Sequence, residues 1–173
     1  MVLIPLRYLP SRLTQKDRSK QIRALSTSRR MYKRGKYYSR PPLKSFKSQK
    51  SKHILLAEKM YGVERIIPNK ELAQKTGCSV NALKEIVKKG EGAYYSSGSR
   101  PNQTARSWGL ARLASSITGG KASAVDYNIL ERGCNHRTSK AFRLAKPPKF
   151  GRRHTRRVDI KNTPYMPPTI TLK

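Results

Sequence analysis

The acidic residues of this chain are concentrated in its middle, and this limits which part can fold on its own. Between Glu58 and Glu131, eleven Lys/Arg are balanced by seven Asp/Glu. Outside this stretch there are 28 Lys/Arg and only two acids, Asp17 and Asp159. Like charges at this density repel one another, so the two ends need an anionic partner or a protein groove to take a defined shape. We therefore expect a folded centre with two cationic arms.

Hydrophobic residues make up 36% of the 173-residue chain, which suits one packed domain with tails. We expect a mainly α fold: a basic N-terminal arm with one helix over 1–52, a helical core over 53–145, and a Pro/Arg-rich extended C-terminal arm over 146–173. No stretch approaches the roughly 20 apolar residues of a membrane span, so none is expected. The apolar start is short and is broken by Pro5, which argues against a signal peptide.

Capping residues and glycines set the expected helix boundaries. Thr14 precedes a predicted helix over 15–33, with Asp17 placed as in a capping box. Further helices are expected between a capping residue and a glycine: 53–61 between Ser51 and Gly62, 70–76 between Asn69 and Gly77, and 80–89 between Ser79 and Gly90. Two more are expected over 105–118 and 121–131, and the second should turn Val125, Ile129 and Leu130 inward.

The two helices over 70–89 have the spacing of a helix-turn-helix. Ala73, Gly77, Leu83 and Ile86 fall where that motif places its small contact residue, its turn glycine and its core residues. The second helix would then expose a polar set suited to phosphates and a base edge, namely Asn81, Lys84, Lys88 and Lys89. A plain helical hairpin within a small core is the alternative interpretation.

A long polar loop is predicted over Gly90–Thr104. Its glycines and serines expose backbone N–H groups, so it is a candidate passive anion site together with Arg100 and Arg106. The alternative is a rigid loop in which Tyr94, Tyr95 and Trp108 pack together.

Aromatic residues alternate with cations over residues 34–52. This pattern suits phosphate contact by Lys/Arg, with the rings against bases or a protein surface. A solvated linker with a few aromatic anchors in its own core is the alternative. In the C-terminal arm, Arg152, Arg153, Arg156 and Arg157 are the candidate partner contacts.

The chain shows no constellation of catalytic residues. Its acids are isolated, and its histidines, His53, His136 and His154, lie in basic surroundings. Cys78 and Cys134 lack the paired spacing of a zinc site, and they are expected to be free thiols in a reducing compartment. We expect no enzyme activity, no cofactor and no metal.

The run from Gly92 to Ser115 (GAYYSSGSRPNQTARSWGLARLAS), followed by Gly119-Gly-Lys-Ala-Ser-Ala-Val-Asp126, is distinctive. With Tyr8-Leu-Pro and Arg34-Gly-Lys-Tyr-Tyr38, it resembles a family of small basic proteins of large double-stranded DNA viruses of algae and protists, phycodnavirus- or mimivirus-like. That family has no assigned activity. The resemblance implies a virus-encoded protein carried in the particle.

The function expected on these grounds is a structural virion component. It would be a minor capsid or cement protein inside the capsid, made in the host cytoplasm or nucleus. Its partners would be capsid proteins, other minor capsid proteins and packaged double-stranded DNA. The alternative is a DNA-binding or condensing protein that uses the helix-turn-helix-like pair, and a ribosome-associated protein is a third.

Overall fold

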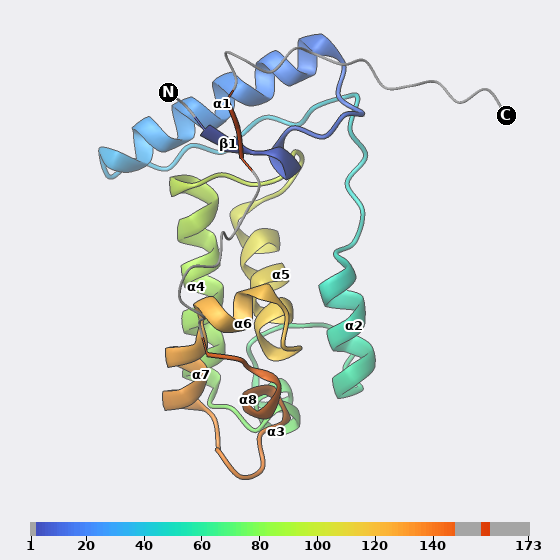
Figure 1. Cartoon of the computed structure of the whole chain (residues 1–173), viewed down its shortest axis with the longest axis vertical. Coiled ribbons are helices and arrows are strands. Elements are labelled where there is room, and N and C mark those ends of the chain that lie inside the picture. Colours follow the sequence, from blue (N-terminus) through green and yellow to red (C-terminus); the bar gives the residue numbers. More distant parts are fainter. Residues whose placement is uncertain (1–2, 148–156, 160–173) are drawn as a thin grey trace, which may run out of the picture. The chain divides into compact units, whose positions relative to one another are not determined.

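The computed structural model describes residues 3–147 and 157–159, and these residues are mainly helical (Figure 1). The expected fold class, mainly α, is therefore confirmed. The chain divides into two units. Unit 1 takes the described parts of Met1–Ser48, Tyr95–Thr104 and Arg152–Lys173, and unit 2 takes those of Gln49–Tyr94 and Ala105–Gly151. Each unit is considered separately below.

Unit 1 is built on one long helix and a short two-stranded sheet. Strand β1 (Leu3–Pro5) leads into a 3-10 turn, η1 (Leu6–Tyr8), and then into helix α1 (Gln15–Lys33). Strand β2 (Arg157–Asp159) pairs antiparallel with β1, and Ile4 is opposite Val158. Three residues of the predicted C-terminal arm are thus paired with the start of the chain.

Helix α1 has the predicted boundaries. The Thr14 hydroxyl accepts a hydrogen bond from the Asp17 backbone N–H, which caps the first turn. The inner face of the helix is unusually polar. The Gln21 side-chain amide donates to the carbonyl oxygens of Tyr8 (3.2 Å) and Ser99 (3.3 Å). These bonds satisfy a side chain that is only 2% exposed, and they tie α1 to both neighbouring segments.

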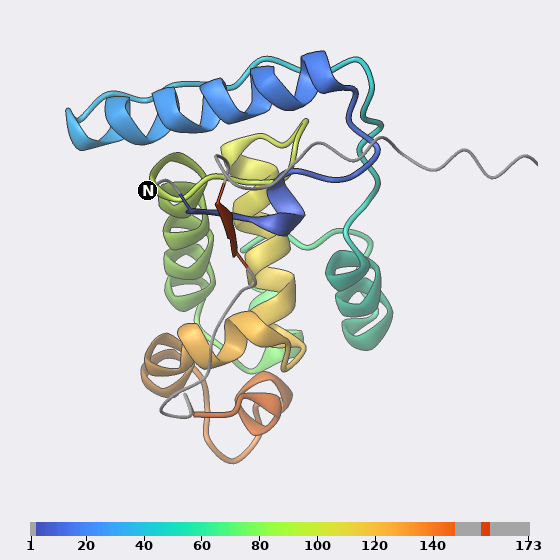
Figure 2. The same cartoon turned by 45° about the horizontal axis from the view of Figure 1, so that its top comes forward.

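After α1 the chain turns and runs back along the helix (Figure 2). Asn102 anchors this return segment: its side chain accepts from the Leu43 N–H and donates to the carbonyl oxygens of Leu43 and Phe46. Its φ of 55° lies in the left-handed region, which asparagine tolerates better than most residues. Arg40 adds bonds to the hydroxyls of Ser28 and Ser99.

Residues 3–48 find many of their packing partners within unit 1. Side chains from each part of this stretch are less than 5% exposed: Ile4, Tyr8, Leu9, Leu13, Leu25 and Leu43. Of the aromatic residues in 34–52, Tyr38 and Phe46 are half-buried and Tyr37 is 71% exposed, and the buried anchor of this segment is the aliphatic Leu43.

Unit 2 is a cluster of helices. They are α2 (Lys52–Tyr61), α3 (Lys70–Thr76), α4 (Val80–Ser96, whose last two residues belong to unit 1), α5 (Ala105–Ile117), α6 (Lys121–Val125), α7 (Tyr127–Gly133) and α8 (Lys140–Leu144). The helix-turn-helix core prediction is confirmed at Leu83 and Ile86, which are fully buried. Gly77 takes a φ of 70° at the turn, as expected.

Burial raises the pKa of the Tyr61 hydroxyl on α2, which donates a hydrogen bond to the Ile117 carbonyl oxygen at the end of α5.

The prediction that Gly90 ends a helix is wrong, because α4 continues to Ser96. The predicted polar loop over Gly90–Thr104 is correspondingly shorter. The reason is close packing: a Cβ added at Gly90 would lie 2.7 Å from the Gly109 Cα on α5. Glycine here allows two helix backbones to touch instead of stopping a helix.

This contact predicts an inverted glycine-to-alanine effect. Alanine normally stabilises a helix interior by about 0.5–1 kcal/mol over glycine. Gly90→Ala should instead lower the free energy of unfolding by about 1–3 kcal/mol, because the methyl group would meet backbone that has no rotamer to move. Urea unfolding measures it, with the exposed Lys88→Ala as control on the same helix. A Gly90→Ala protein as stable as the wild type would contradict the close approach.

The predicted single helix over 121–131 is two helices. Asp126 ends α6 and begins α7, and its backbone carbonyl accepts from the N–H groups of Ile129 and Leu130. This break changes the direction of the chain. Ile129 and Leu130 are buried as predicted, but Val125 is 49% exposed, so the prediction that it faces inward is wrong.

The two cysteines are not free thiols. Cys78 and Cys134 form a disulfide between the α3–α4 turn and the end of α7, across 56 positions of sequence. Backbone hydrogen bonds flank it, from Ser79 N–H to Gly133 O (2.7 Å) and from Asn135 N–H to Gly77 O (2.8 Å). Sequence spacing alone gave no reason to pair them, and the inference of a reducing compartment loses its basis.

Candidate nucleic-acid interface

The outer face of α1 carries a row of exposed cations, here called the α1 stripe. Its residues follow one another at three-, four- or seven-residue intervals, so they share one side of the helix: Lys16, Lys20, Arg23 and Arg30. At 1.5 Å per residue the row is about 21 Å long. Its first half borders a shallow, open depression that Gln15 and Ser19 also line.

The one acid on α1 does not neutralise the α1 stripe. Asp17 is 6% exposed and accepts from the Ser45 N–H (2.9 Å) and the Ser45 hydroxyl (2.7 Å). These two hydrogen bonds, with a smaller contribution from Lys20 and Lys16, hold the pKa of Asp17 below its usual value. The carboxylate therefore binds the return segment through Ser45. Of the α1 cations, Lys20 forms an ion pair with it, at 3.9 Å between Nζ and Oδ1.

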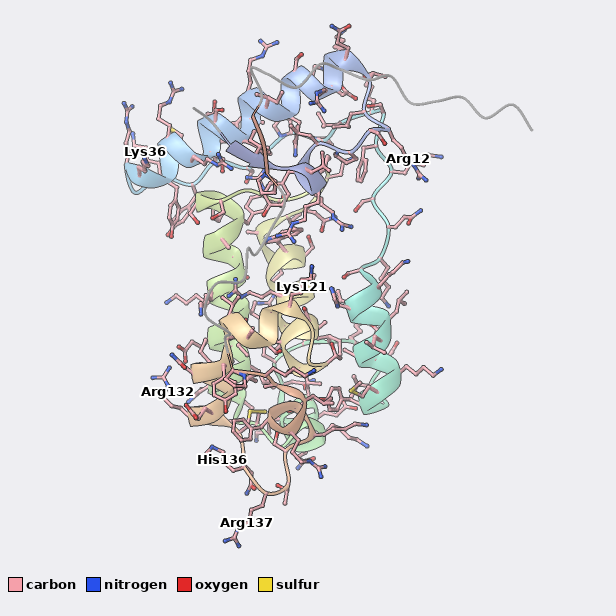
Figure 3. The ribbon with its side chains drawn as sticks, viewed as in Figure 1. Arg12, Lys36, Lys121, Arg132, His136 and Arg137 are labelled. Atoms are coloured by element: carbon pink, nitrogen blue, oxygen red, sulfur yellow. A yellow bond between two sulfur atoms is a disulfide. The ribbon has the colours of Figure 1, made fainter. Side chains whose placement is uncertain are left out.

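Charge separates the two units. Over residues 3–48, 95–104 and 157–159, sixteen Lys/Arg accompany two acids, whereas over 49–94 and 105–147, seventeen Lys/Arg accompany seven acids. The described part of unit 1 is therefore strongly cationic. Figure 3 shows Arg12 and Lys36 at the two ends of α1, both directed away from it.

All four predicted contacts on α4 are exposed as expected: Asn81, Lys84, Lys88 and Lys89. Glu85, which lies between Lys84 and Lys88 in the sequence, pairs with Arg132 at 3.3 Å. The turn before α4 is covered, because the Ser139 hydroxyl donates to Thr76 O and a Cβ at Gly77 would meet the Ser139 backbone at 2.8 Å. The helix-turn-helix-like pair is thus embedded in unit 2, with mixed charge on its outer face.

Lys89 has a structural task that sequence reasoning missed. Its ammonium group lies 3.1 Å from an oxygen of Asp126, a fully buried carboxylate, and donates to the Val125 carbonyl oxygen. The same carboxylate accepts two bonds from Arg112, at 2.6 and 2.9 Å, and one from the Ser116 hydroxyl. This network joins α4, α5 and the α6–α7 junction.

The predicted members of the 90–104 anion site belong to different units. Arg100 is exposed in unit 1, whereas Arg106 belongs to unit 2 and pairs with Glu91 at 3.5 Å. Tyr94 is buried in the last part of α4, and Trp108 is half-buried on α5. Tyr95 lies against Tyr32 and Tyr37, two rings that the alternative reading did not include.

The predicted C-terminal contacts lie almost wholly beyond the structure. Arg152, Arg153 and Arg156 are outside the described residues, and Arg157 is described only as the first residue of β2. Within residues 3–147, no three His, Cys, Asp or Glu side chains gather in a way that could hold a metal ion. The helices of this part are too short or too polar to cross a bilayer.

The cations of the α1 stripe were not among the site residues that the sequence predicted. A signal was present in the sequence, because Lys/Arg recur at helical spacing on one side of the predicted helix over 15–33, with Leu25 on the other. The sequence alone did not show that this helix, which has few apolar residues, packs against other segments of its own chain.

Together, the fold and this surface describe a small, mainly helical protein with one strongly cationic unit. The chain belongs to a family of unknown function, DUF5824, whose model matches residues 5–132. The match takes in the whole of α1 and all helices of unit 2 except the last residue of α7 and α8. Neither the curated proteins nor the solved structures contain a match to this chain.

Proposed function

We propose that this protein binds nucleic acid without catalysis, through phosphate contacts made by the α1 stripe. The observation that supports this most is a row of four exposed cations on a helix whose single acid is buried and hydrogen-bonded elsewhere. Such a surface attracts a polyanion strongly, and its only internal counter-charge is the Asp17 carboxylate, 3.9 Å from the Lys20 ammonium group.

The dimensions of the stripe fit a phosphate backbone. A duplex strand presents one phosphate per 3.4 Å of helix axis, so about 21 Å of helix faces roughly six phosphates. Four long, exposed cationic side chains spread over that length can follow a strand without a fixed register. We therefore infer binding to the backbone with little dependence on base sequence.

The α1 stripe is a better candidate than α4. On α4, the exposed Glu85 follows Lys84 directly in the sequence, and Lys89 pairs with Asp126. A helix that presents both signs of charge is a weaker polyanion site than one that presents cations alone. The helix-turn-helix-like pair is then a packing element of unit 2, in line with the plain-hairpin alternative.

The resemblance to proteins of large DNA viruses suggests the setting. We propose that the nucleic acid is the packaged genome, and that the protein is a structural component inside the particle, between DNA and capsid subunits. Support for this setting comes from the quoted sequence runs, and support for the binding comes from the charge of unit 1. Purified virions that retain the protein after nuclease and high-salt treatment would favour capsid neighbours as well.

A matched pair of variants tests the binding site. Lys16→Gln/Lys20→Gln and Lys84→Gln/Lys88→Gln each remove two lysines four residues apart on a helix. Binding to a 30-base-pair duplex is measured by fluorescence anisotropy at several salt concentrations. Each lost phosphate contact lowers the slope of log affinity against log salt by about 0.9, so the α1 variant should lose about two.

The α4 variant is the control and should keep the wild-type slope within about half a unit. A larger loss in the α4 variant than in the α1 variant would move the site to unit 2. Wild-type protein that shows no salt-dependent binding to duplex would refute the proposed function as a whole.

A further inference from the structure

Three tyrosine rings meet beside the last turn of α1 in unit 1. Tyr32 and Tyr95 are nearly parallel, at 6° and 6.3 Å between ring centroids. Tyr37 lies at 4.8 Å from Tyr95 and 6.2 Å from Tyr32, tilted by about 55° to both. Tyr37 is 71% exposed and Tyr32 37% exposed. We call these three residues the tyrosine cluster.

The end of α1 brings Tyr37 back to Tyr32. Gly35 takes a φ of 71°, its N–H bonds to Tyr32 O, and the Lys36 N–H bonds to Met31 O, both at 3.0 Å. This is the Schellman arrangement, in which a left-handed glycine reverses the chain just after a helix. The residue two positions beyond the glycine therefore returns to the helix end and does not continue outward.

Tyr37 is thus an exposed ring that is positioned before any ligand arrives. Its ring packs against Tyr32 and Tyr95 and is still 71% exposed, so little conformational freedom is left for it to lose on binding. An exposed, oriented aromatic face is the feature by which proteins that bind single strands stack a base.

The charge around the ring identifies the class of partner. Lys33, Arg34 and Lys36 are all exposed within four positions of Tyr37. No acid is near in sequence: the nearest before Tyr37 is Asp17, which is buried, and the nearest after it is Glu58 in unit 2. An exposed aromatic ring with three exposed cations close by in the sequence matches a base that is flanked by phosphates, and it is poorly suited to a neutral apolar protein surface.

We propose that the tyrosine cluster stacks an unpaired base of a single-stranded nucleic acid, with Tyr37 as the contacting ring. This inference rests on the proposed function, because the neighbouring cations must first hold the strand. It adds a preference for single-stranded over duplex nucleic acid, which the α1 stripe alone does not give. Bases in a duplex hide their faces against one another, so Tyr37 contributes only where the strand is open.

The test compares a 20-nucleotide DNA single strand, the duplex of the same sequence, and a strand of equal length without bases. Tyr37→Leu removes the ring and keeps an apolar side chain, and Tyr37→Trp restores an aromatic face. Tyr37→Leu should lose roughly 5- to 150-fold in affinity for the single strand, which is the usual effect of one stacked base. Its affinity for the duplex and for the strand without bases should stay within about twofold of the wild type.

Tyr37→Trp should bind the single strand at least as well as the wild type, and a melting curve checks that each variant is folded. Unchanged single-strand binding by Tyr37→Leu would overturn the inference and assign the ring to a protein partner. Equal losses on all three probes would also overturn it, because stacking needs a base. In both cases, binding of the wild type to the duplex would still support the proposed function. If the wild type bound none of the three probes, both the stacking inference and the proposed function would be wrong.

Discussion

Replacing Arg112 with methionine is expected to lower the free energy of unfolding by about 3–5 kcal/mol. Asp126 is fully buried, and Arg112 gives it two hydrogen bonds at 2.6 and 2.9 Å. Without Arg112, the carboxylate would keep only Ser116 and Lys89, and the Lys89 side chain is 45% exposed. A buried charge without its main partner accounts for the loss, because methionine retains much of the apolar bulk of arginine.

The partner substitution should cost less. Asp126→Asn removes the buried charge, and the two cations left behind are partly exposed, at 18% for Arg112 and 45% for Lys89. Water can therefore solvate them. Combining Arg112→Met with Asp126→Asn should recover part of the stability lost in Arg112→Met alone, as contacting residues do in a double-mutant cycle.

Guanidinium unfolding at neutral pH of the wild type, both single variants and the double variant completes this cycle. If the losses of the two single variants simply add in the double variant, Arg112 and Asp126 are not coupled as the structure indicates. Lys88→Met is the control, since it removes an exposed cation next to Lys89 on α4.

Opening the Cys78–Cys134 disulfide is expected to cost about 2–4 kcal/mol. The bond closes a loop of 56 positions, and in the chain-entropy model a loop of this length restricts the unfolded chain by about 4 kcal/mol. The folded state should change little, because flanking backbone hydrogen bonds and the buried Ser139 hydroxyl hold the same two segments. Unfolding with and without a reducing agent measures the effect.

The Cys78→Ser/Cys134→Ser variant should match the reduced wild type and should not respond to reducing agent. Thiol titration of the denatured, unreduced protein gives an independent check, in which no free thiol is expected. Two free thiols there, with no effect of reducing agent on stability, would show that the cysteines are unpaired.

Local signals predicted most helix boundaries well. The caps at Thr14, Ser51 and Asn69 and the left-handed glycines at 62 and 77 act within one helical turn, so a single sequence reveals them. The α1 stripe is also visible in the sequence, because the helical spacing of its cations is a local pattern. Gly90 failed as a stop signal because its role depends on Gly109, nineteen positions away.

By itself the sequence determined the helical class, the ends of α1, α2 and α3, and the segregation of acids into unit 2, since each depends on neighbours within a few residues or on composition. Only the tertiary structure decided which side chains meet: Cys78 with Cys134, Lys89 and Arg112 with Asp126, and Tyr95 with Tyr32 and Tyr37. Such pairings depend on how helices pack across long loops. Many pairings are compatible with one pattern of residues, and the packing energy of the whole fold selects among them.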